Sequence, residues 1–299
     1  MPDKDSNRLL LMGLAASGKS SIRSVVFEGK LPGDVEQQQA TINYIRSPEN
    51  IVDSPFTLFD CGGQNSFISD FVGKKAGFIF SKVAALIWII DASDTATILS
   101  SQLYFINAIK QLNEYSPGAA VYVFFHKMDL FQNKKAREEV IRLLEPFFKS
   151  EFGLQVTYRA TSIFDGTASG AIGEILQEQL LKSTKARTVT QALRDFISRN
   201  QELSGIAIYT GNGLPVFEEG FDTDKLLLPV NLWLTNHSRI SSQFDAAPYK
   251  LVLETGDLVL VFQQLNREFF LSGICKKLTP LQHVLLKLDQ LTGIISSLL

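Results

Sequence analysis

Short apolar runs alternate with longer amphipathic stretches through the first half of the chain. Five runs have the length and continuity of buried strands: residues 8–13, 55–60, 83–91, 119–126 and 156–162. Helix-like segments lie between them, at residues 19–28, 96–115, 134–149 and 171–181. Continuous apolar strands separated by helices are typical of a mostly parallel sheet with helices on both faces. The pattern therefore predicts an α/β domain, which we expect to span residues 1–184.

The pattern changes in the second half of the chain. The predicted elements there are a helix at 188–200, a hairpin at 205–217, a helix at 222–244 interrupted near Pro229, strands at 249–254, 258–265 and 268–275, and a helix at 279–299. A Gly-Asn-Gly turn marks the hairpin, and Thr-Pro opens the last helix. This order predicts a second, smaller α/β domain with an antiparallel sheet, over residues 185–299.

Composition narrows the class of protein. The 299 residues include 29 basic and 31 acidic side chains, a net charge of −2 that argues against nucleic-acid binding and against a polybasic membrane surface. Two cysteines cannot build a disulfide framework, which favours a reducing compartment. The longest apolar run, residues 83–90, is too short to span a bilayer. We expect a soluble, intracellular protein of two domains, with no nucleic-acid partner and no direct membrane insertion.

A phosphate-binding loop follows the first strand. Residues 13–20 fit the spacing G-x-x-x-x-G-K-S and open a helix, the context that separates this motif from a glycine-rich turn with a chance lysine. The glycines let backbone amides point at phosphate, Lys19 supplies a positive charge, and Ser20 supplies an oxygen for Mg²⁺. The expected phosphate contacts are Gly13, Ala15, Ala16, Ser17, Gly18, Lys19, Ser20 and Ser21.

Residues suited to metal binding and hydrolysis follow in order along the chain. Asp60 ends the second strand and can hold a water on Mg²⁺, while Thr41 can add a second hydroxyl to the metal. Gly63 can offer its backbone N–H to a γ-phosphate, and Gln64 can orient an attacking water. Each residue is a weak signal alone, but the set following a phosphate loop predicts nucleotide hydrolysis.

A third group of residues predicts which base is bound. Asp129 follows the fourth strand and can accept hydrogen bonds from guanine N1–H and N2–H₂, a donor pair that adenine lacks. Lys127 can lay its aliphatic stem across the ring system. Ser162 and Ile163 end the fifth strand, and the Ile163 N–H can donate to guanine O6. These residues favour GTP and GDP over ATP.

Together these motifs resemble the Rag (Gtr) branch of Ras-related GTPases. That branch has His where the usual base-recognition box begins with Asn, as His126 does before Lys127 and Asp129 here. The resemblance implies phosphate and metal contacts within residues 13–20, Thr41 as switch I and residues 60–64 as switch II. It also implies guanine contacts from His126, Lys127, Asp129 and Ile163. The element order of the second domain resembles the roadblock (longin-like) domain of the same proteins.

The resemblance also implies partners and a setting. It implies a dimer through the roadblock domains, with a second copy or with a related Rag-like chain, and regulation by GTPase-activating and exchange proteins. Signalling to the TOR kinase in response to nutrients is expected, from a cytoplasmic protein that partners recruit to lysosomal or vacuolar membranes. The apolar segment 226–237, with Trp233, is expected to be a helix that contributes to such a contact.

The sequence alone leaves two other functions possible besides a GTP-hydrolysing switch. No arginine is assigned to catalysis, because Arg23 lies on the phosphate-loop helix and Arg46 lies far from any motif. We therefore expect slow intrinsic hydrolysis. An interaction scaffold stabilised by nucleotide, with little or no hydrolysis, is the main alternative, since the second domain carries no catalytic set. An ATPase or small-molecule kinase is a third reading, and Asp129 argues against it.

Overall fold

The computed structural model describes residues 7–35, 41, 43–149, 153–220, 250–266, 268–277 and 279–299. The chain divides into two compact units. The first unit contains residues up to Val25, Pro32–Ile51 and Pro55–Ala171; the second contains Val26–Leu31, Val52–Ser54 and Ile172–Leu299. The predicted division after residue 184 stays a prediction.

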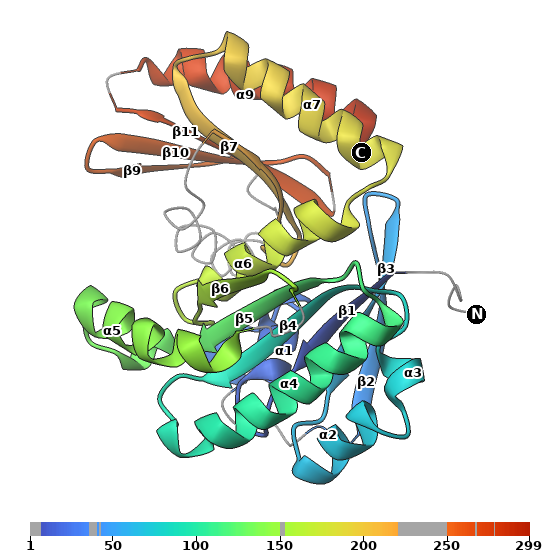
Figure 1. Ribbon diagram of the computed structural model, residues 1–299. Helices are drawn as coiled ribbons and strands as arrows, with labels where there is room; N and C mark the ends of the chain where they lie inside the picture. The colour runs from blue at the N-terminus through green and yellow to red at the C-terminus, as the bar shows by residue number, and fades with distance from the viewer. Residues whose placement is uncertain are drawn as a thin grey trace. The chain divides into compact units, whose positions relative to one another are not determined.

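The first unit is built on a sheet of six described strands in the order β2-β3-β1-β4-β5-β6 (Figure 1). Their bounds are β1 Asn7–Met12, β2 Tyr44–Ile51, β3 Ser54–Cys61, β4 Val83–Asp91, β5 Ala120–His126 and β6 Val156–Ala160. β1 pairs in parallel with β3 and β4, and β5 pairs in parallel with β4 and β6. Because parallel neighbours need crossover connections, their carboxyl ends, and the loops that follow them, gather at one edge of the sheet.

Helices occupy the crossovers between these strands, and two further helical segments, α6 and η5, follow β6. The α-helices are α1 Lys19–Val26, α2 Asn65–Val72, α3 Ala76–Ile79, α4 Ile98–Tyr115, α5 Lys134–Leu144 and α6 Thr167–Ile175. Shorter turns of helix are η1 Pro32–Asp34, η2 Thr95–Thr97, η3 Met128–Leu130, η4 Glu145–Phe148 and the π-helical η5 Leu176–Leu180. None of the helices in the described part of the chain is both long and apolar enough to cross a membrane.

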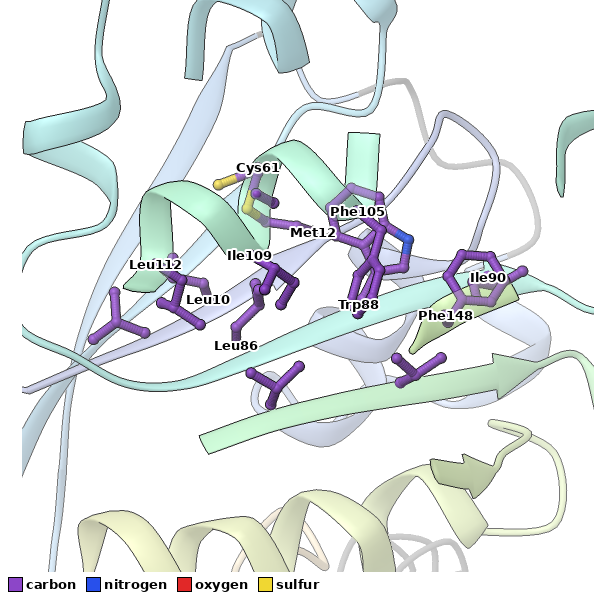
Figure 2. Packing of buried hydrophobic residues seen from close by; sticks show 14 of the residues in the cluster. Leu10, Met12, Cys61, Leu86, Trp88, Ile90, Phe105, Ile109, Leu112 and Phe148 are labelled. Atoms are coloured by element: carbon purple, nitrogen blue, oxygen red, sulfur yellow. The ribbon is translucent and has the colours of Figure 1, made fainter. Parts of the chain in front are cut away.

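The core of the first unit explains why its strands read as continuous apolar runs. Alternate residues of β4, such as Leu86 and Trp88, pack toward α4 in a cluster that includes Phe105 and Phe148 (Figure 2). The Trp88 and Phe105 rings meet edge to face with centroids 5.7 Å apart. Ile87, which lies between Leu86 and Trp88 on β4 and points to the other face of the sheet, is also 0% exposed. Both faces of the sheet are therefore covered.

The second unit holds an antiparallel sheet of five described strands in the order β8-β7-β11-β10-β9. Its elements are α7 Thr184–Arg199, β7 Leu203–Thr210, β8 Pro215–Glu219, β9 Lys250–Thr255, β10 Leu258–Gln264, β11 Phe269–Lys276 and α9 Leu281–Leu298. Ser183 caps α7, its Oγ accepting from the Ala186 N–H at 3.0 Å. The side chain of Leu288 on α9 lies so close to Gly273 on β11 that a Cβ there would approach its Cδ2 to 2.8 Å.

The predicted fold class is confirmed: a mostly parallel α/β sheet precedes a smaller unit with an antiparallel sheet. Strand β2 was not among the predicted strands, because it lies at the edge of the sheet and its segment, YIRSPENI, is mostly polar and exposed. The short α2 and α3 were also not predicted, and α6 begins at Thr167 rather than at residue 171. The predicted helix at 222–244, with its apolar part 226–237, lies outside the described residues.

Candidate nucleotide and metal site

The phosphate loop turns tightly between β1 and α1. Gly13 has φ of 144°, and a Cβ there would lie 2.1 Å from the Ile89 carbonyl oxygen of β4. Gly18 has φ of 102°, and a Cβ there would lie 2.4 Å from Cδ2 of His126 on β5. Both glycines thus have a backbone conformation and a close approach that exclude a side chain. The loop therefore lies directly against the carboxyl-terminal parts of β4 and β5.

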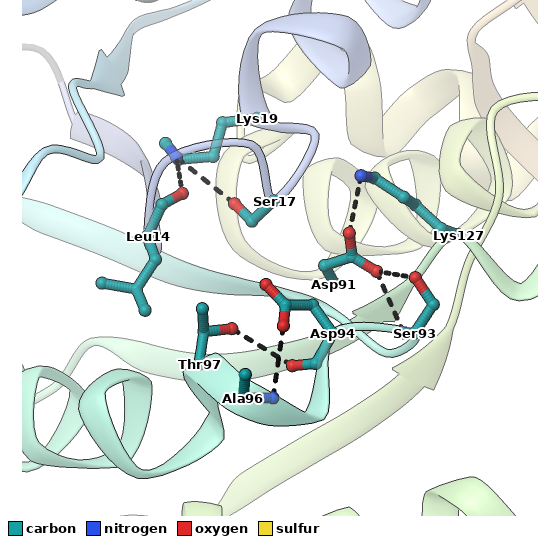
Figure 3. Close-up of polar contacts among 9 residues, drawn as sticks. All are labelled: Leu14, Ser17, Lys19, Asp91, Ser93, Asp94, Ala96, Thr97 and Lys127. Carbon is teal, nitrogen blue, oxygen red and sulfur yellow. Dashed lines mark hydrogen bonds and ion pairs between the residues drawn. The ribbon is translucent and has the colours of Figure 1, made fainter.

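Lys19 is enclosed by the loop that it follows. Its side chain donates from Nζ to the Leu14 carbonyl oxygen at 2.6 Å and to Ser17 Oγ at 3.3 Å (Figure 3). Burial lowers the pKa of Lys19 to about 8, and the nearby Asp60 carboxylate opposes this shift. Both acceptors are uncharged, so anionic phosphate oxygens would be better partners for this ammonium.

Three oxygen-bearing side chains meet beside Lys19. Ser20 Oγ lies 2.8 Å from Thr41 Oγ1 and 2.9 Å from Asp60 Oδ2, and Thr41 Oγ1 lies 3.4 Å from the same oxygen. Asp60 is completely buried, and its Oδ1 has no hydrogen-bond partner among the described residues. Mg²⁺ prefers hydroxyl, carboxylate and water oxygens. The donor set and the unpaired carboxylate oxygen therefore fit a Mg²⁺ site.

The segment after Asp60 lies against the phosphate loop. The Gly63 carbonyl accepts from the Ala15 N–H at 2.7 Å, and a Cβ on Gly63 would lie 2.4 Å from the Ala15 nitrogen. The Gly62 N–H donates to the Asn43 carbonyl at 2.6 Å. Gln64 precedes α2, and its side chain is exposed and makes no capping bond. The predicted switch II is thus held through its backbone while Gln64 stays accessible.

His126 is buried between the phosphate loop and β6. Its Nδ1 lies 3.0 Å from Thr161 Oγ1. Burial lowers the pKa of His126 to about 4, although the carboxylates of Asp129 and Asp91 act in the opposite direction. His126 therefore lies, as a neutral ring, between Gly18 of the phosphate loop and Thr161, which follows β6.

Lys127 and Asp129 project from the turn that follows β5. Lys127 adopts φ of 62°, and its Nζ donates to Asp91 Oδ2 at 2.6 Å (Figure 3). Burial raises the pKa of Asp91, but hydrogen bonds from Lys127 and Ser93 outweigh this and hold it below its usual value. Ser162 donates from Oγ to Asp129 Oδ1 at 2.5 Å. Both side chains are therefore positioned by partners from neighbouring strand ends.

One cavity of about 560 Å³ joins these groups. The predicted residues that line it are Ala15, Ala16, Gly18, Lys19, Ser20, Ser21, Thr41, Gly63, Gln64, His126, Lys127, Asp129 and Ile163. Gly13, Ser17, Asp60 and Ser162 do not line it; Ser17, Asp60 and Ser162 are hydrogen-bonded to residues that do, and Gly13 lies against Ile89 of β4. Pro32, Val35, Leu130 and Phe164 also line the cavity and were not predicted. The roles assigned to these residues remain predictions.

The remaining residues singled out in the sequence lie apart from this cavity or outside the described residues. Cys61 and Cys275 are buried free thiols, and burial raises the pKa of each. His283 is exposed and pairs with Glu202 at 3.2 Å. His237 lies outside the described residues. The described part of the chain contains no cluster of His, Cys, Asp and Glu able to hold a metal.

The buried His126 predicts a pH-dependent loss of stability. An unfolded histidine takes up a proton near pH 6.5, whereas the folded ring does so only near pH 4. Stability should therefore fall as pH decreases between these values, by about 3 kcal/mol for this group. The His126→Asn variant should lack this part of the loss. Urea unfolding of both proteins from pH 8 to 4 measures the difference, with pH 8 as the baseline; parallel profiles would contradict a buried neutral ring.

The chain matches a family model and curated GTP-binding proteins of the Gtr/Rag type. A family model described as the Gtr1/RagA G protein conserved region matches residues 8–211. GTP-binding protein GTR1 of Saccharomyces cerevisiae is 35% identical over 181 residues, 59% of this chain and 58% of that protein. GTP-binding protein gtr2 of Schizosaccharomyces pombe is 25% identical over 290 residues, 90% of this chain and 88% of that protein.

Solved structures also resemble part of the chain. The Arl6 BBS3 small GTPase from Trypanosoma brucei, with the bound nucleotide analogue GppNp, matches 58% of this chain and 96% of its own, at 20% identity and a TM-score of 0.45. The chain spans 58% of the length of GTR1 of Saccharomyces cerevisiae and 60% of the length of GTP-binding protein gtr1 of Schizosaccharomyces pombe, to which it is 32% identical over 194 residues.

Proposed function

This chain belongs to the Gtr1/RagA family of G proteins, and from that premise we propose that it binds GTP and hydrolyses it slowly as a nucleotide-controlled switch. The observation that carries the proposal is one cavity lined both by the phosphate loop, here called its phosphate end, and by Asp129, here called its base end. Its volume of about 560 Å³ is within the range of ordinary ligand sites. The residues lining it divide into phosphate, metal and base groups.

The phosphate end would exchange internal contacts for contacts with nucleotide. Lys19 would leave the Leu14 carbonyl for phosphate oxygens. The Ala15 N–H, now bonded to the Gly63 carbonyl, would turn to phosphate as well. Ser20 and Thr41 hydroxyls would ligate Mg²⁺, with Asp60 behind them. A bound Mg²⁺ would supply positive charge against the charge that develops on the phosphate oxygens during hydrolysis.

The base end supports a preference for guanine. Asp129 lines the cavity, and the bond from Ser162 fixes one of its carboxylate oxygens. A fixed carboxylate accepts from the N1–H and N2–H₂ of guanine, whereas adenine offers no such pair. Losing a charge-assisted pair costs roughly 2–3 kcal/mol, which corresponds to about 30- to 100-fold in affinity. The ion pair with Asp91 holds Lys127 at the same end of the cavity.

Gln64 would assist hydrolysis in this proposal. It lines the cavity beside Gly63, at the start of α2, with a side chain that makes no capping bond there. An amide in this place can orient a water for attack on the γ-phosphate. The Gly63 peptide can reorient because glycine accepts conformations closed to other residues. Loss of the γ-phosphate would let Gly63 return to Ala15, which couples hydrolysis to the shape of the loop.

We also propose that the chain dimerises through its second unit, with a second copy or a related family member. The match to gtr2 extends over 90% of the chain and so includes that unit. Among the described strands, β9 pairs on one side only, with β10, and an edge of this kind can add a further strand. Regulation by GTPase-activating and exchange proteins, nutrient signalling to the TOR kinase, and recruitment to lysosomal or vacuolar membranes belong to the same proposal.

Native mass spectrometry of the purified full chain tests the proposed function in one measurement. We expect the mass of a dimer carrying one guanine nucleotide and Mg²⁺ per subunit, because buried phosphate contacts retain nucleotide through purification. A monomer at micromolar concentration would contradict the dimer. A chain that carries adenine nucleotide, or that takes up no guanine nucleotide when it is supplied, would contradict the switch.

A further inference from the structure

The Asp60 carboxylate, which would support the proposed Mg²⁺ site, also forms an ion pair with Arg23. Asp60 Oδ2 accepts from Arg23 Nε at 3.2 Å, in addition to its bonds from Ser20 and Thr41. The Asp60 side chain is 0% exposed and that of Arg23 is 16% exposed. Asp60 Oδ1 meets no donor within the described residues. One carboxylate oxygen is therefore shared by several donors while the other is left for a further partner.

Helix geometry places Arg23 at this carboxylate. Arg23 follows Ser20 by three residues on α1, so the two side chains lie on the same face of the helix. Ser20 and Thr41 line the nucleotide cavity, whereas Arg23 and Asp60 do not. Arg23 therefore contacts the same carboxylate oxygen as Ser20 and Thr41 without lining the cavity itself. It can influence a metal at this site through Asp60 without touching nucleotide.

The ion pair has opposite consequences in the two states of the site. Without Mg²⁺, Arg23 supplies, together with the nearby Lys19, the positive charge that a fully buried carboxylate needs, and of these two Arg23 is the one in an ion pair with Asp60. With Mg²⁺ present, the same positive charge lies close to a dication and reduces the attraction of Asp60 for it. Such effects are large at buried positions because solvent screens them poorly. Arg23 and Mg²⁺ therefore compete electrostatically for one carboxylate.

We propose that Arg23 is a positioning residue that holds Asp60 in place when Mg²⁺ is absent and raises the Mg²⁺ concentration needed to retain nucleotide. The inference rests on the proposed function, since it assumes that Mg²⁺ and guanine nucleotide bind at this site. It extends that function by giving the chain a built-in control over nucleotide release. Nucleotide is then released at Mg²⁺ concentrations that would otherwise retain it, because Mg²⁺ must bind against the positive charge of Arg23.

The test is the release rate of fluorescently labelled GDP from the full chain over a series of Mg²⁺ concentrations. All variants are purified with Mg²⁺ and GDP, so that each measurement starts from loaded protein. Arg23→Gln should shift the Mg²⁺ midpoint for slow release to lower concentration by at least roughly tenfold. Arg194→Gln removes an exposed arginine paired with Glu219 and should keep the wild-type midpoint. General weakening of the fold would speed release at every Mg²⁺ concentration and leave the midpoint unchanged.

Arg23→Met covers the case in which Arg23→Gln does not fold in any state. Its unbranched side chain replaces the aliphatic part of arginine without the charge, so the midpoint should move in the same direction by at least roughly tenfold. An unchanged midpoint in Arg23→Gln, or in Arg23→Met where only that variant folds, overturns the inference. A wild-type chain that binds no GDP at any Mg²⁺ concentration contradicts the proposed function instead. The two failures are thus distinguishable.

Discussion

Replacing Lys19 with alanine should lower the affinity for GTP by about 10²- to 10³-fold, because a buried ammonium is lost from the phosphate end of the cavity. The side chain of Lys19 is almost fully enclosed and, within the described part of the chain, donates to two uncharged oxygens of its own loop. Those bonds cost little to exchange for phosphate. Isothermal titration calorimetry with GTP and Mg²⁺ measures the change.

The matched control for this substitution is Lys134→Ala. Lys134 is 90% exposed and pairs only loosely, at 3.8 Å, with Glu138 on the surface of α5. The control should bind GTP as the wild type does, since an exposed pair of this kind contributes little. Thermal melting of Lys19→Ala in the absence of nucleotide establishes that the variant is folded. A folded Lys19→Ala that binds GTP with unchanged affinity would rule out the assignment of the phosphate loop.

Gln64→Leu should keep GTP binding and lose most hydrolysis, by roughly 10²-fold in single-turnover rate. The side chain of Gln64 is exposed at the start of α2 and makes no capping bond, so its loss should leave the fold intact. What is lost is the amide that orients the attacking water. The measurement is phosphate release from preloaded GTP in a single turnover, with a binding titration beside it.

Asn65→Leu is the control for Gln64→Leu, because it adds the same apolar side chain to the next exposed position of α2. It should hydrolyse GTP close to the wild-type rate. If Gln64→Leu turned over GTP as fast as the wild type, Gln64 would have no part in the reaction. A wild-type rate of zero, with and without cell extract to supply an activating protein, would instead favour the nucleotide-stabilised scaffold.

Much of the first unit was predictable because its strands are buried on both faces. The strand β4 reads as one apolar run, since Leu86 and Ile87 point to opposite faces and both are fully buried. Strand β2 escaped prediction for the converse reason: an edge strand with solvent on much of its surface does not need apolar residues. Local periodicity reports burial, so a strand such as β2, which is polar and largely open to solvent, gives only a weak signal.

Some residues of the candidate site could be predicted from the sequence and others could not. Residues with a fixed spacing, such as Lys19 and Ser20, can be assigned from sequence because the loop geometry depends on that spacing. Arg23 and Asp91 could not be assigned, because each acts through an ion pair with a residue more than thirty positions away. The signal available for Arg23 was its place one helical turn after Ser20. Phe164, exposed at the cavity rim, carried no motif at all.

The central claim is that this chain closes its phosphate loop on the triphosphate of a guanine nucleotide with Mg²⁺. Its most direct test is a calorimetric titration of the nucleotide-free full chain with GTP at millimolar Mg²⁺, repeated with ATP as competitor. We predict one GTP per chain, bound about 30- to 100-fold more tightly than ATP. No binding of GTP under these conditions, or equal binding of ATP, would contradict the account.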